Sequence, residues 1–321
     1  MAAVYIGIDV SKEWLDIAVW PGAASFRVSN ASAGVAQLRE RVQALEPCAV
    51  VLEASGGPET LAAGELHAAG LPVAVVNPRQ ARAFARSLGR LAKTDRVDAL
   101  GLAQFAQSSH SNGRLIPLRL PDAAEAALKA LVARRRQLIG ILVAETNRRT
   151  RAPKVVRKSI VQSIKGLKRA LAEVEQQLRQ TVAGAPAQQA KAELLGAVPG
   201  VGPQLTVTLI AALPELGRLD RRAIAALVGV APYAHESGTF KGRRTIWGGR
   251  ARVRTMLYMA ALSAVRHNPP LRVHYQALLA RGKAKKLALV ACMRKLLITL
   301  NAILRDAAPW NPNHLDCQHS R

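Results

Sequence analysis

The stretch VYIGIDVSKEWLDIAVW, residues 4–20, decides the fold of the N-terminal third, because it holds two strand patterns in succession. Residues 4–10 and 13–20 are predicted strands, and the second alternates apolar and polar residues with the period of two that a half-buried strand has. A third strand pattern follows at 24–30, and apolar residues recur at helical spacing over 32–45. The chain is therefore expected to begin with three antiparallel strands and an amphipathic helix.

Strand and helix patterns continue to alternate through the rest of this third. A buried strand at 48–54 precedes a helix at 59–69, and a short strand at 72–77 precedes a helix that opens at Pro78. Thr94 can cap the last helix of the region. Three antiparallel strands followed by βαβ units predict an α/β fold with a mixed sheet covered by helices.

Strand patterns disappear after about residue 122, so the remainder is predicted to be mainly helical. One apolar seam there alternates steps of four and three residues, which is typical of heptads. The seam fits a helical hairpin that packs on itself, and it also fits a contact between subunits. Its residues are Ile160, Ile164, Leu167, Leu171, Val174 and Leu178.

These patterns divide the chain into four predicted parts. Residues 1–119 form the α/β domain, residues 120–185 a helical linker of coiled-coil type, and residues 186–310 a mainly α domain. Residues 311–321 include one cysteine and two histidines, but they are expected to be a C-terminal tail and not a metal site.

Positive charge is concentrated in the second part of the chain. The net charge is +25; residues 1–119 hold 12 Lys and Arg against 10 Asp and Glu, whereas residues 120–321 hold 34 against 11. This excess indicates a polyanion binder, because each neutralised phosphate releases condensed counterions. The basic stretches are scattered over loops and several helices, which disfavours a protein of membrane surfaces. Aromatic residues make up only 4%, which argues against a single-strand reader built from stacking platforms.

The compartment is predicted from the cysteines and from the first residues. Cys48, Cys292 and Cys317 are too few and too scattered for a disulfide framework or a zinc ribbon. No charged and apolar leader opens the chain, and no run of eighteen apolar residues follows. We expect a soluble, reduced, cytoplasmic protein without a membrane partner.

Four acidic residues lie where a sheet and a helix can bring them together. Asp9 ends the first strand, and Glu53 ends the fourth, which in a ribonuclease H-like sheet lies beside the first. Asp95 and Asp98 are three apart on a helix and so share a face. Such acids can hold two divalent cations, and ligation by oxygen alone selects Mg²⁺ or Mn²⁺ over zinc. Taken singly, an Asp after a strand is more often an ordinary turn residue, and two acids three apart on a helix are usually part of a solvated face; Asp16 is assigned to the surface.

Two features of the helical part, a basic tip and a glycine-rich turn, and one lysine before them suit phosphate groups. The segment 148–158 would be the tip of a helical hairpin, and the glycines of VPGVGP (198–203) would free backbone N–H groups at a helix start, although a solvated turn and a packing hairpin are the alternatives. Lys93 lies near the acids and could bind phosphate or form a plain salt bridge. The candidates in these segments are Lys93, Arg148, Arg149, Arg151, Lys154, Arg157, Lys158, Gly200 and Gly202.

Ser237 stands in a basic, glycine-rich segment, HESGTFKGRR (235–244). A serine nucleophile needs activation and a hydroxyl that stands clear of regular structure, so a loop is expected here. The neighbouring cations would clamp phosphate; they are Lys241, Arg243, Arg244 and Arg250. The alternative is a phosphate-binding loop in which Ser237 only donates a hydrogen bond.

Five of these motifs resemble those of one family: GIDVSK, LEASGG, KTDRVDA, VPGVGP and APYAHESGTFKGRR. Together, and in this order, they are similar to the DEDD-type transposases of insertion sequences, the RNA-guided bridge recombinases. The resemblance covers nearly the whole chain. It implies a ribonuclease H-like, RuvC-type N-terminal domain, a helical linker, and a C-terminal transposase domain with a helix-hairpin-helix-like element.

The same resemblance implies a chemistry. Asp9, Glu53, Asp95 and Asp98 match the family's four metal-binding acids, and Ser237 matches the serine that attacks a DNA phosphodiester. The implied partners are donor and target DNA and a non-coding guide RNA. The resemblance also implies a homo-oligomer in which two subunits together complete one site. Two other functions stay open. One is a RuvC-like endonuclease that hydrolyses DNA with the same acids, and the other is a non-catalytic nucleic-acid scaffold.

Overall fold

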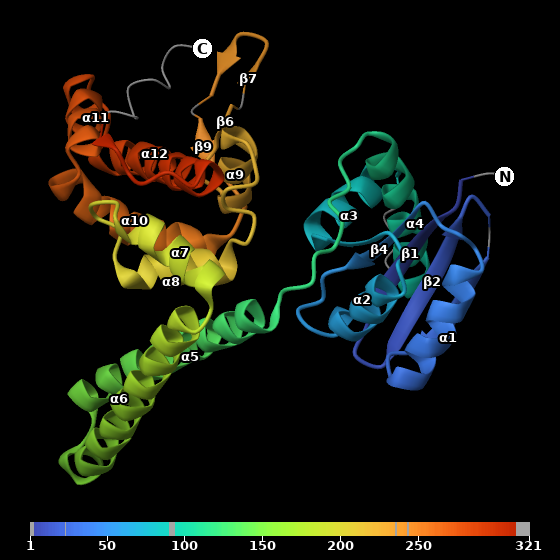
Figure 1. Cartoon of the computed structure of the whole chain (residues 1–321), viewed down its shortest axis with the longest axis horizontal. Helices are drawn as coiled ribbons and strands as arrows, with labels where there is room; N and C mark the ends of the chain where they lie inside the picture. Colours follow the sequence, from blue (N-terminus) through green and yellow to red (C-terminus); the bar gives the residue numbers. More distant parts are fainter. Residues whose placement is uncertain (1–2, 23, 90–93, 235, 243, 313–321) are drawn as a thin grey trace. The chain divides into compact units, whose positions relative to one another are not determined.

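The computed structural model describes residues 3–22, 24–89, 94–234, 236–242 and 244–312 (Figure 1). The chain divides into two compact units, with the boundary between Leu120 and Pro121. Each unit has its own hydrophobic core.

The first unit is built on a five-stranded mixed sheet with the strand order β3-β2-β1-β4-β5. β1 pairs antiparallel with β2, and β2 pairs antiparallel with β3, whereas β4 lies parallel to both β1 and β5. The mixed sheet predicted from the sequence is therefore confirmed. The strands are β1 (Tyr5–Val10), β2 (Trp14–Trp20), β3 (Ser25–Ser29), β4 (Ala49–Glu53) and β5 (Val73–Val76).

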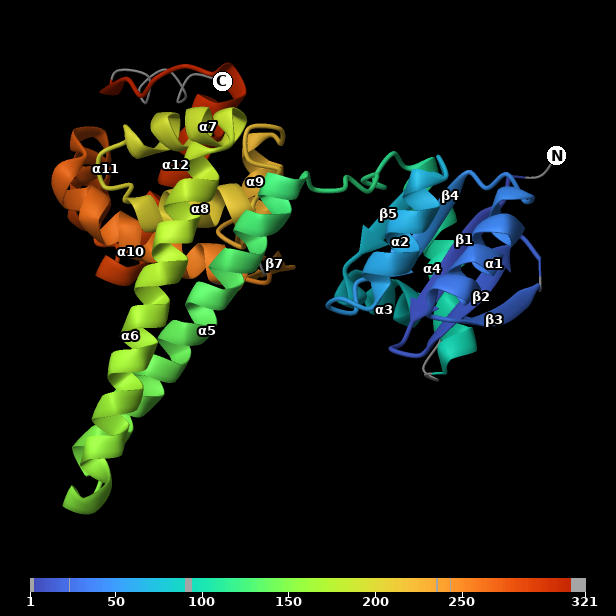
Figure 2. The same cartoon turned by 60° about the horizontal axis from the view of Figure 1, so that its bottom comes forward.

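Helices cover both faces of this sheet (Figure 2). Ile6 and Ile8 pack with apolar residues of α1 and α2, whereas Tyr5 packs with residues of α3 and α4. Because successive side chains of a strand point to opposite faces, Gly7 and Asp9 lie on the face that α4 covers. The four helices are α1 (Ser32–Gln43), α2 (Glu59–Ala68), α3 (Pro78–Ser87) and α4 (Asp95–Ser111).

α4 lies unusually close to β1 because residue 7 is a glycine. A Cβ atom on Gly7 would come within 2.2 Å of the backbone of Ala99 and of Ala103. Ala18 completes this buried patch of small residues with the same two alanines. As predicted, Thr94 caps the helix, and its side chain accepts a hydrogen bond from the Val97 N–H at 3.4 Å. The close approach fixes the first turn of α4 over the end of β1.

The second unit begins with a helical hairpin of α5 (Ala123–Arg151) and α6 (Lys154–Ala183). Asp122 and Glu125 form a reciprocal capping box at the start of α5. Val174 and Leu178 of the predicted seam are buried in one core with Leu128 and Leu138 of α5. The seam thus packs against α5 within the same chain.

Six further helices share this core with the base of the hairpin. The core therefore includes residues on both sides of the boundary predicted between the linker, 120–185, and the mainly α domain, 186–310. α12 has the length and composition of a membrane span, but half of it is buried inside the unit, where Leu296, Leu297 and Leu300 belong to the core. The helices are α7 (Pro186–Gly196), α8 (Pro203–Ala212), α9 (Arg221–Val228), α10 (Ala251–His267), α11 (Pro269–Ala280) and α12 (Lys285–Asp306).

The prediction that strands end after residue 122 is wrong for one segment. Four short strands form two antiparallel ribbons, in which β6 pairs with β9 and β7 with β8. Each strand has only two residues, which is too short for an alternating pattern to be visible in the sequence. The strands are β6 (Pro232–Tyr233), β7 (Glu236–Ser237), β8 (Phe240–Lys241) and β9 (Thr245–Ile246).

Candidate active site

Two acids reach the candidate site from neighbouring strands of the first unit. Asp9 is the penultimate residue of β1, and Glu53 is the last residue of β4. The parallel register pairs Gly7 with Val51, so Glu53 falls beside Asp9 on the face that α4 covers. The sheet alone therefore brings these two carboxylates to the same edge.

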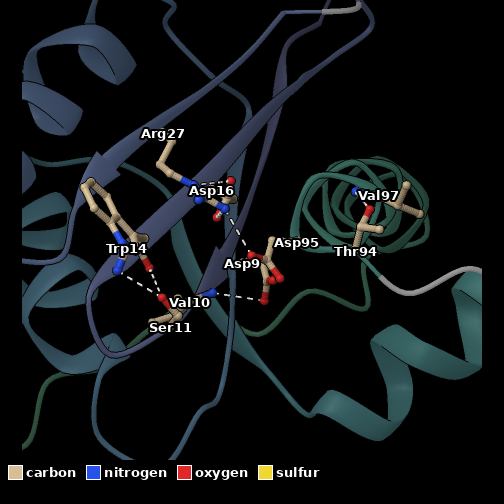
Figure 3. Close-up of polar contacts among 9 residues, drawn as sticks. All are labelled: Asp9, Val10, Ser11, Trp14, Asp16, Arg27, Thr94, Asp95 and Val97. Carbon is tan, nitrogen blue, oxygen red and sulfur yellow. Dashed lines mark hydrogen bonds and ion pairs between the residues drawn. The ribbon is translucent and has the colours of Figure 1, made fainter.

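α4 supplies the other two acids from its first turn, where Asp95 and Asp98 lie. Burial raises the pKa of Asp9 to about 6, and the negative charges of Glu53, Asp98 and Asp95 contribute to the shift in that order. The Val10 N–H donates to Asp9 Oδ1 at 3.0 Å and opposes the shift. Figure 3 shows Asp9 and the first turn of α4 side by side. The four predicted acids thus form one electrostatic cluster.

Arginines offset part of this charge. Arg27 donates to Asp16 through two hydrogen bonds of 2.9 Å and to Asp95 at 3.0 Å (Figure 3). Arg82 lies 3.6 Å from Asp98. Among the residues that the structure describes, no three Asp, Glu, His or Cys side chains are close enough to hold a metal ion. The acids are neighbours, but Asp95 and Asp98 are engaged by guanidinium groups.

Asp16 belongs to this cluster, so its assignment to the surface was wrong. Its side chain is only 13% exposed, and it lies directly opposite Asp9 in the β1–β2 register. Residues opposite each other in an antiparallel pair share a face of the sheet. The sequence signal was available, because positions 9 and 16 lie at equal distances from the turn that joins the two strands.

The donor set suits a hard divalent cation. Asp9, Glu53 and Asp16 lie on one face of the sheet, and the negative charges of Glu53, Asp98 and Asp95 add to the burial that raises the pKa of Asp9. Carboxylate oxygens without histidine or cysteine are the ligands that Mg²⁺ and Mn²⁺ prefer. The chemistry of the donor set, though not yet the spacing of its side chains, therefore fits the metal that the four-acid pattern implies.

Ser237 is in the second unit, and it lies in a hairpin where an irregular loop was expected. It ends β7 and pairs with Phe240 of β8, so that Gly238 and Thr239 form a two-residue turn. Gly238 has a φ of +53°, which suits glycine at the first position of such a turn. Ser237 is exposed, and so its hydroxyl still lies open to solvent at the end of a strand.

The base of the Ser237 segment is anchored to the helices around it. Arg250 donates to both carboxylate oxygens of Glu215, at 2.5 and 2.6 Å, and to the Ala212 carbonyl at 3.0 Å. Although burial raises the pKa of Glu215, the hydrogen bonds and charge of Arg250 lower it below its usual value. Arg254 adds a hydrogen bond of 2.5 Å to the Gly248 carbonyl. Arg250 was predicted to bind phosphate, but its guanidinium is engaged in this internal contact.

Two other cations of the segment, Lys241 and Arg244, belong to the described residues. Arg244 is exposed and forms an ion pair of 3.8 Å with Glu236. Lys241 lies in β8. Lys93 and Arg243 lie outside the described residues.

The turn between α5 and α6 exposes all the cations predicted there. Ala152 is buried, and its carbonyl accepts a hydrogen bond of 2.8 Å from Arg157 Nε. Arg148 forms an ion pair with Glu145 one turn away. The exposed residues are Arg148, Arg149, Arg151, Lys154, Arg157 and Lys158.

The two glycines of the predicted phosphate-binding turn have different surroundings. Gly200 has a φ of +93°, and a Cβ there would lie 2.5 Å from Ala264 Cα of α10. The packing alternative therefore accounts for Gly200. Gly202 precedes α8, is exposed, and has no atom within 4 Å of an added Cβ.

Comparison with known proteins shows which family this chain belongs to. Residues 6–156 match a sequence family described as transposase, and residues 192–276 match the transposase IS116/IS110/IS902 family. The pilin gene-inverting protein of Moraxella bovis is 26% identical over 97% of this chain and 98% of its own length. A 42 kDa protein of insertion element IS900 of Mycobacterium paratuberculosis is 32% identical over 38% of this chain and 31% of its own length. The two family matches cover most of both units, and the chain belongs to the DEDD-type IS110 family of transposases.

Proposed function

We propose that this transposase cuts and rejoins DNA through a covalent link between Ser237 and a DNA phosphate, with Mg²⁺ or Mn²⁺ held by Asp9, Glu53, Asp95 and Asp98. The observation that carries the proposal is the acidic cluster, in which burial and then the charges of three neighbouring carboxylates raise the pKa of Asp9 to about 6. Acids so arranged cost free energy unless a cation offsets them. The substrate is DNA, because the chain belongs to a family of transposases.

Each group of residues would have a separate role in the reaction. The acids of β1, β4 and α4 would hold the metal, which supplies charge stabilisation to a phosphoryl group in transfer. Asp16 and Arg27 would orient Asp95, since Arg27 bridges the two carboxylates. Arg244 would bind phosphate beside the serine.

Ser237 would form the covalent bond. Its Oγ bonds to phosphorus while the bond from phosphorus to a deoxyribose oxygen breaks, and that oxygen leaves as a hydroxyl after taking a proton. The serine proton passes to solvent. The phosphoserine link keeps the bond energy for rejoining, which simple hydrolysis would lose. The exposed position of Ser237 at the end of β7 supports this role.

A guide RNA and an oligomer complete the proposal. The Moraxella relative is named for inverting a gene, which is a reaction that breaks and rejoins DNA, and it is similar over nearly its whole length. Of the net charge of +25, nearly all lies after residue 119, which suits binding to nucleic acid backbones. We propose that base pairing with a non-coding RNA selects donor and target DNA, and that acids and serine of different subunits meet at one site.

A plasmid cleavage assay tests the proposal. The substrate is a supercoiled plasmid that carries the DNA flanking the gene, with RNA transcribed from the adjoining non-coding stretch and with Mg²⁺. We expect nicking and a protein–DNA adduct that survives denaturing electrophoresis. Ser237→Ala should remove both, whereas Thr239→Ala, an exposed hydroxyl of the same turn, should retain both.

Two results would contradict the proposal. Cleavage by Ser237→Ala without an adduct would indicate hydrolysis by the acids alone. Unchanged cleavage by Asp9→Asn would show that the acidic cluster does not take part, whereas a native chain that binds the plasmid but never cleaves it would favour a scaffold role.

A further inference from the structure

Exposed aromatic rings are concentrated in the segment that carries Ser237. The chain has only 4 Trp, 4 Tyr and 4 Phe. Among the described residues, three of the four large exposed aromatic side chains lie between residues 233 and 247: Tyr233 at 42%, Phe240 at 66% and Trp247 at 70%. None of the three belongs to a hydrophobic core or packs against one. A single exposed ring needs no explanation, but three in one short segment are typical of an interaction site.

One of these rings stands next to the serine. Ser237 and Phe240 are Cα partners in the β7–β8 pair. Opposite residues of an antiparallel pair share a face, with Cβ atoms roughly 5 Å apart. The ring of Phe240 therefore lies beside the hydroxyl that we propose attacks phosphate. Trp247 follows β9 of the second ribbon in the same anchored segment.

The charge around the rings favours a nucleic acid as the occupant. Lys241, Arg244 and Trp247 lie within seven residues, and the Arg250–Glu215 and Arg254–Gly248 contacts hold the base of the segment. Aromatic faces interleaved with cations are the usual means of binding single strands, because every base has a face to stack on and every phosphate has a charge.

We propose that Phe240 stacks on the DNA base next to the phosphate that Ser237 attacks, and that Trp247 stacks on a further base of the same strand. A base inside a duplex is already stacked on both faces, so the strand must be unpaired where it is cut. The segment would then hold the reacting strand by its bases as well as by its charge. This inference rests on the proposed role of Ser237, but its test does not require cleavage.

Binding of short oligonucleotides separates stacking from phosphate contact. We would measure, by fluorescence anisotropy on the full chain, binding of a single-stranded dT oligomer and of an abasic oligomer of the same length. The native chain should bind the base-bearing strand about tenfold more tightly, as expected for one or two stacked bases. Phe240→Ala with Trp247→Ala should remove that preference. Val273→Ala with Met259→Ala, which changes two other exposed apolar side chains, should retain it.

Further variants keep this outcome distinct from failure of the catalytic proposal. Arg244→Gln should weaken binding of both oligomers to the same extent, and Ser237→Ala should keep the preference for bases. If the aromatic double variant stays folded by circular dichroism and still prefers the base-bearing strand, the inference is wrong. It is also wrong if the double variant loses binding of a U oligoribonucleotide only, because the occupant is then RNA, or if it changes only the oligomeric state.

Discussion

The two regions proposed to react with DNA are built in opposite ways. The acids stand on a sheet edge under a tightly packed helix, and their positions follow from strand register and from the absence of a side chain at Gly7. Ser237 stands on a two-residue strand that is anchored through Arg250 and Arg254 at its base and exposed at its end. A metal site needs ligands at fixed positions, whereas a nucleophile that forms a covalent link must reach the DNA. The structure separates these two requirements between two units.

The largest expected effect comes from mixing two inactive variants. Asp9→Asn and Ser237→Ala should each lower adduct formation at least about 10³-fold, because each removes one half of the reaction. If the acids and the serine of different subunits meet, a mixed dimer has one intact site, and random mixing restores about a quarter of native activity. Co-expression with two affinity tags and an adduct assay would measure this. No recovery in purified mixed dimers would place both halves in one subunit.

The acid region should be the more sensitive to a single methyl group. Gly7→Ala places a Cβ within 2.2 Å of the backbone of Ala99 and Ala103, so α4 must move away from β1. We expect a loss of about 3 kcal/mol in the free energy of unfolding, measured by urea denaturation of the full chain. Gly64→Ala on α2, where an added Cβ meets nothing within 4 Å, is the matched control. Equal stability of the two variants would contradict the packing described for α4.

The serine region should instead depend on its anchor. Glu215→Gln removes the charge that holds Arg250, and we expect a loss of about 1–2 kcal/mol, since a charged hydrogen bond in a half-buried site is weakened. Hydrogen exchange should rise in peptides that contain residues 230–250 and stay unchanged in peptides from the first unit. If residues 230–250 are protected from exchange equally in the native chain and in Glu215→Gln, the ion pair does not hold the segment.

The smallest expected effect is a dependence of stability on pH in the acid region. The pKa of Asp9 is raised from 3.8 to about 6 in the folded chain, so the folded state binds more protons than the unfolded state between these values. Without metal, the free energy of unfolding should therefore fall as pH rises from about 4 to about 6, by about 1 kcal/mol after allowance for solvent screening. Asp9→Asn should remove this slope, and Mg²⁺ should stabilise the native chain above pH 6 but not the variant.

The sequence predicted much of the acid region because its signals are local. Strand and helix periods located Asp9, Glu53, Asp95 and Asp98, and the parallel pairing of β1 with β4 confirmed the expected sheet. Asp16 was missed because its place depends on the register between two strands and not on its own neighbours in sequence.

The serine region was harder to predict. Strands of two residues leave no period, and the partner of Arg250 is Glu215, which lies 35 residues away. An arginine in a basic segment resembles a phosphate contact until that partner is known. The aromatic residues of the segment were too few to alter the composition of the chain, and only their exposure distinguishes them.

The helical hairpin of α5 and α6 extends well beyond the hydrophobic core of the second unit. Leu138 is the last residue of α5 buried in the core, and α5 continues to Arg151, which at 1.5 Å per residue adds about 20 Å. Along B-form DNA that distance spans about six base pairs at 3.4 Å each. If the tip cations bind phosphate as predicted, they would lengthen the footprint on DNA without enlarging the globular body. Shortening both helices by equal whole turns should therefore shrink the footprint in steps, while the serine and the acids stay unaltered.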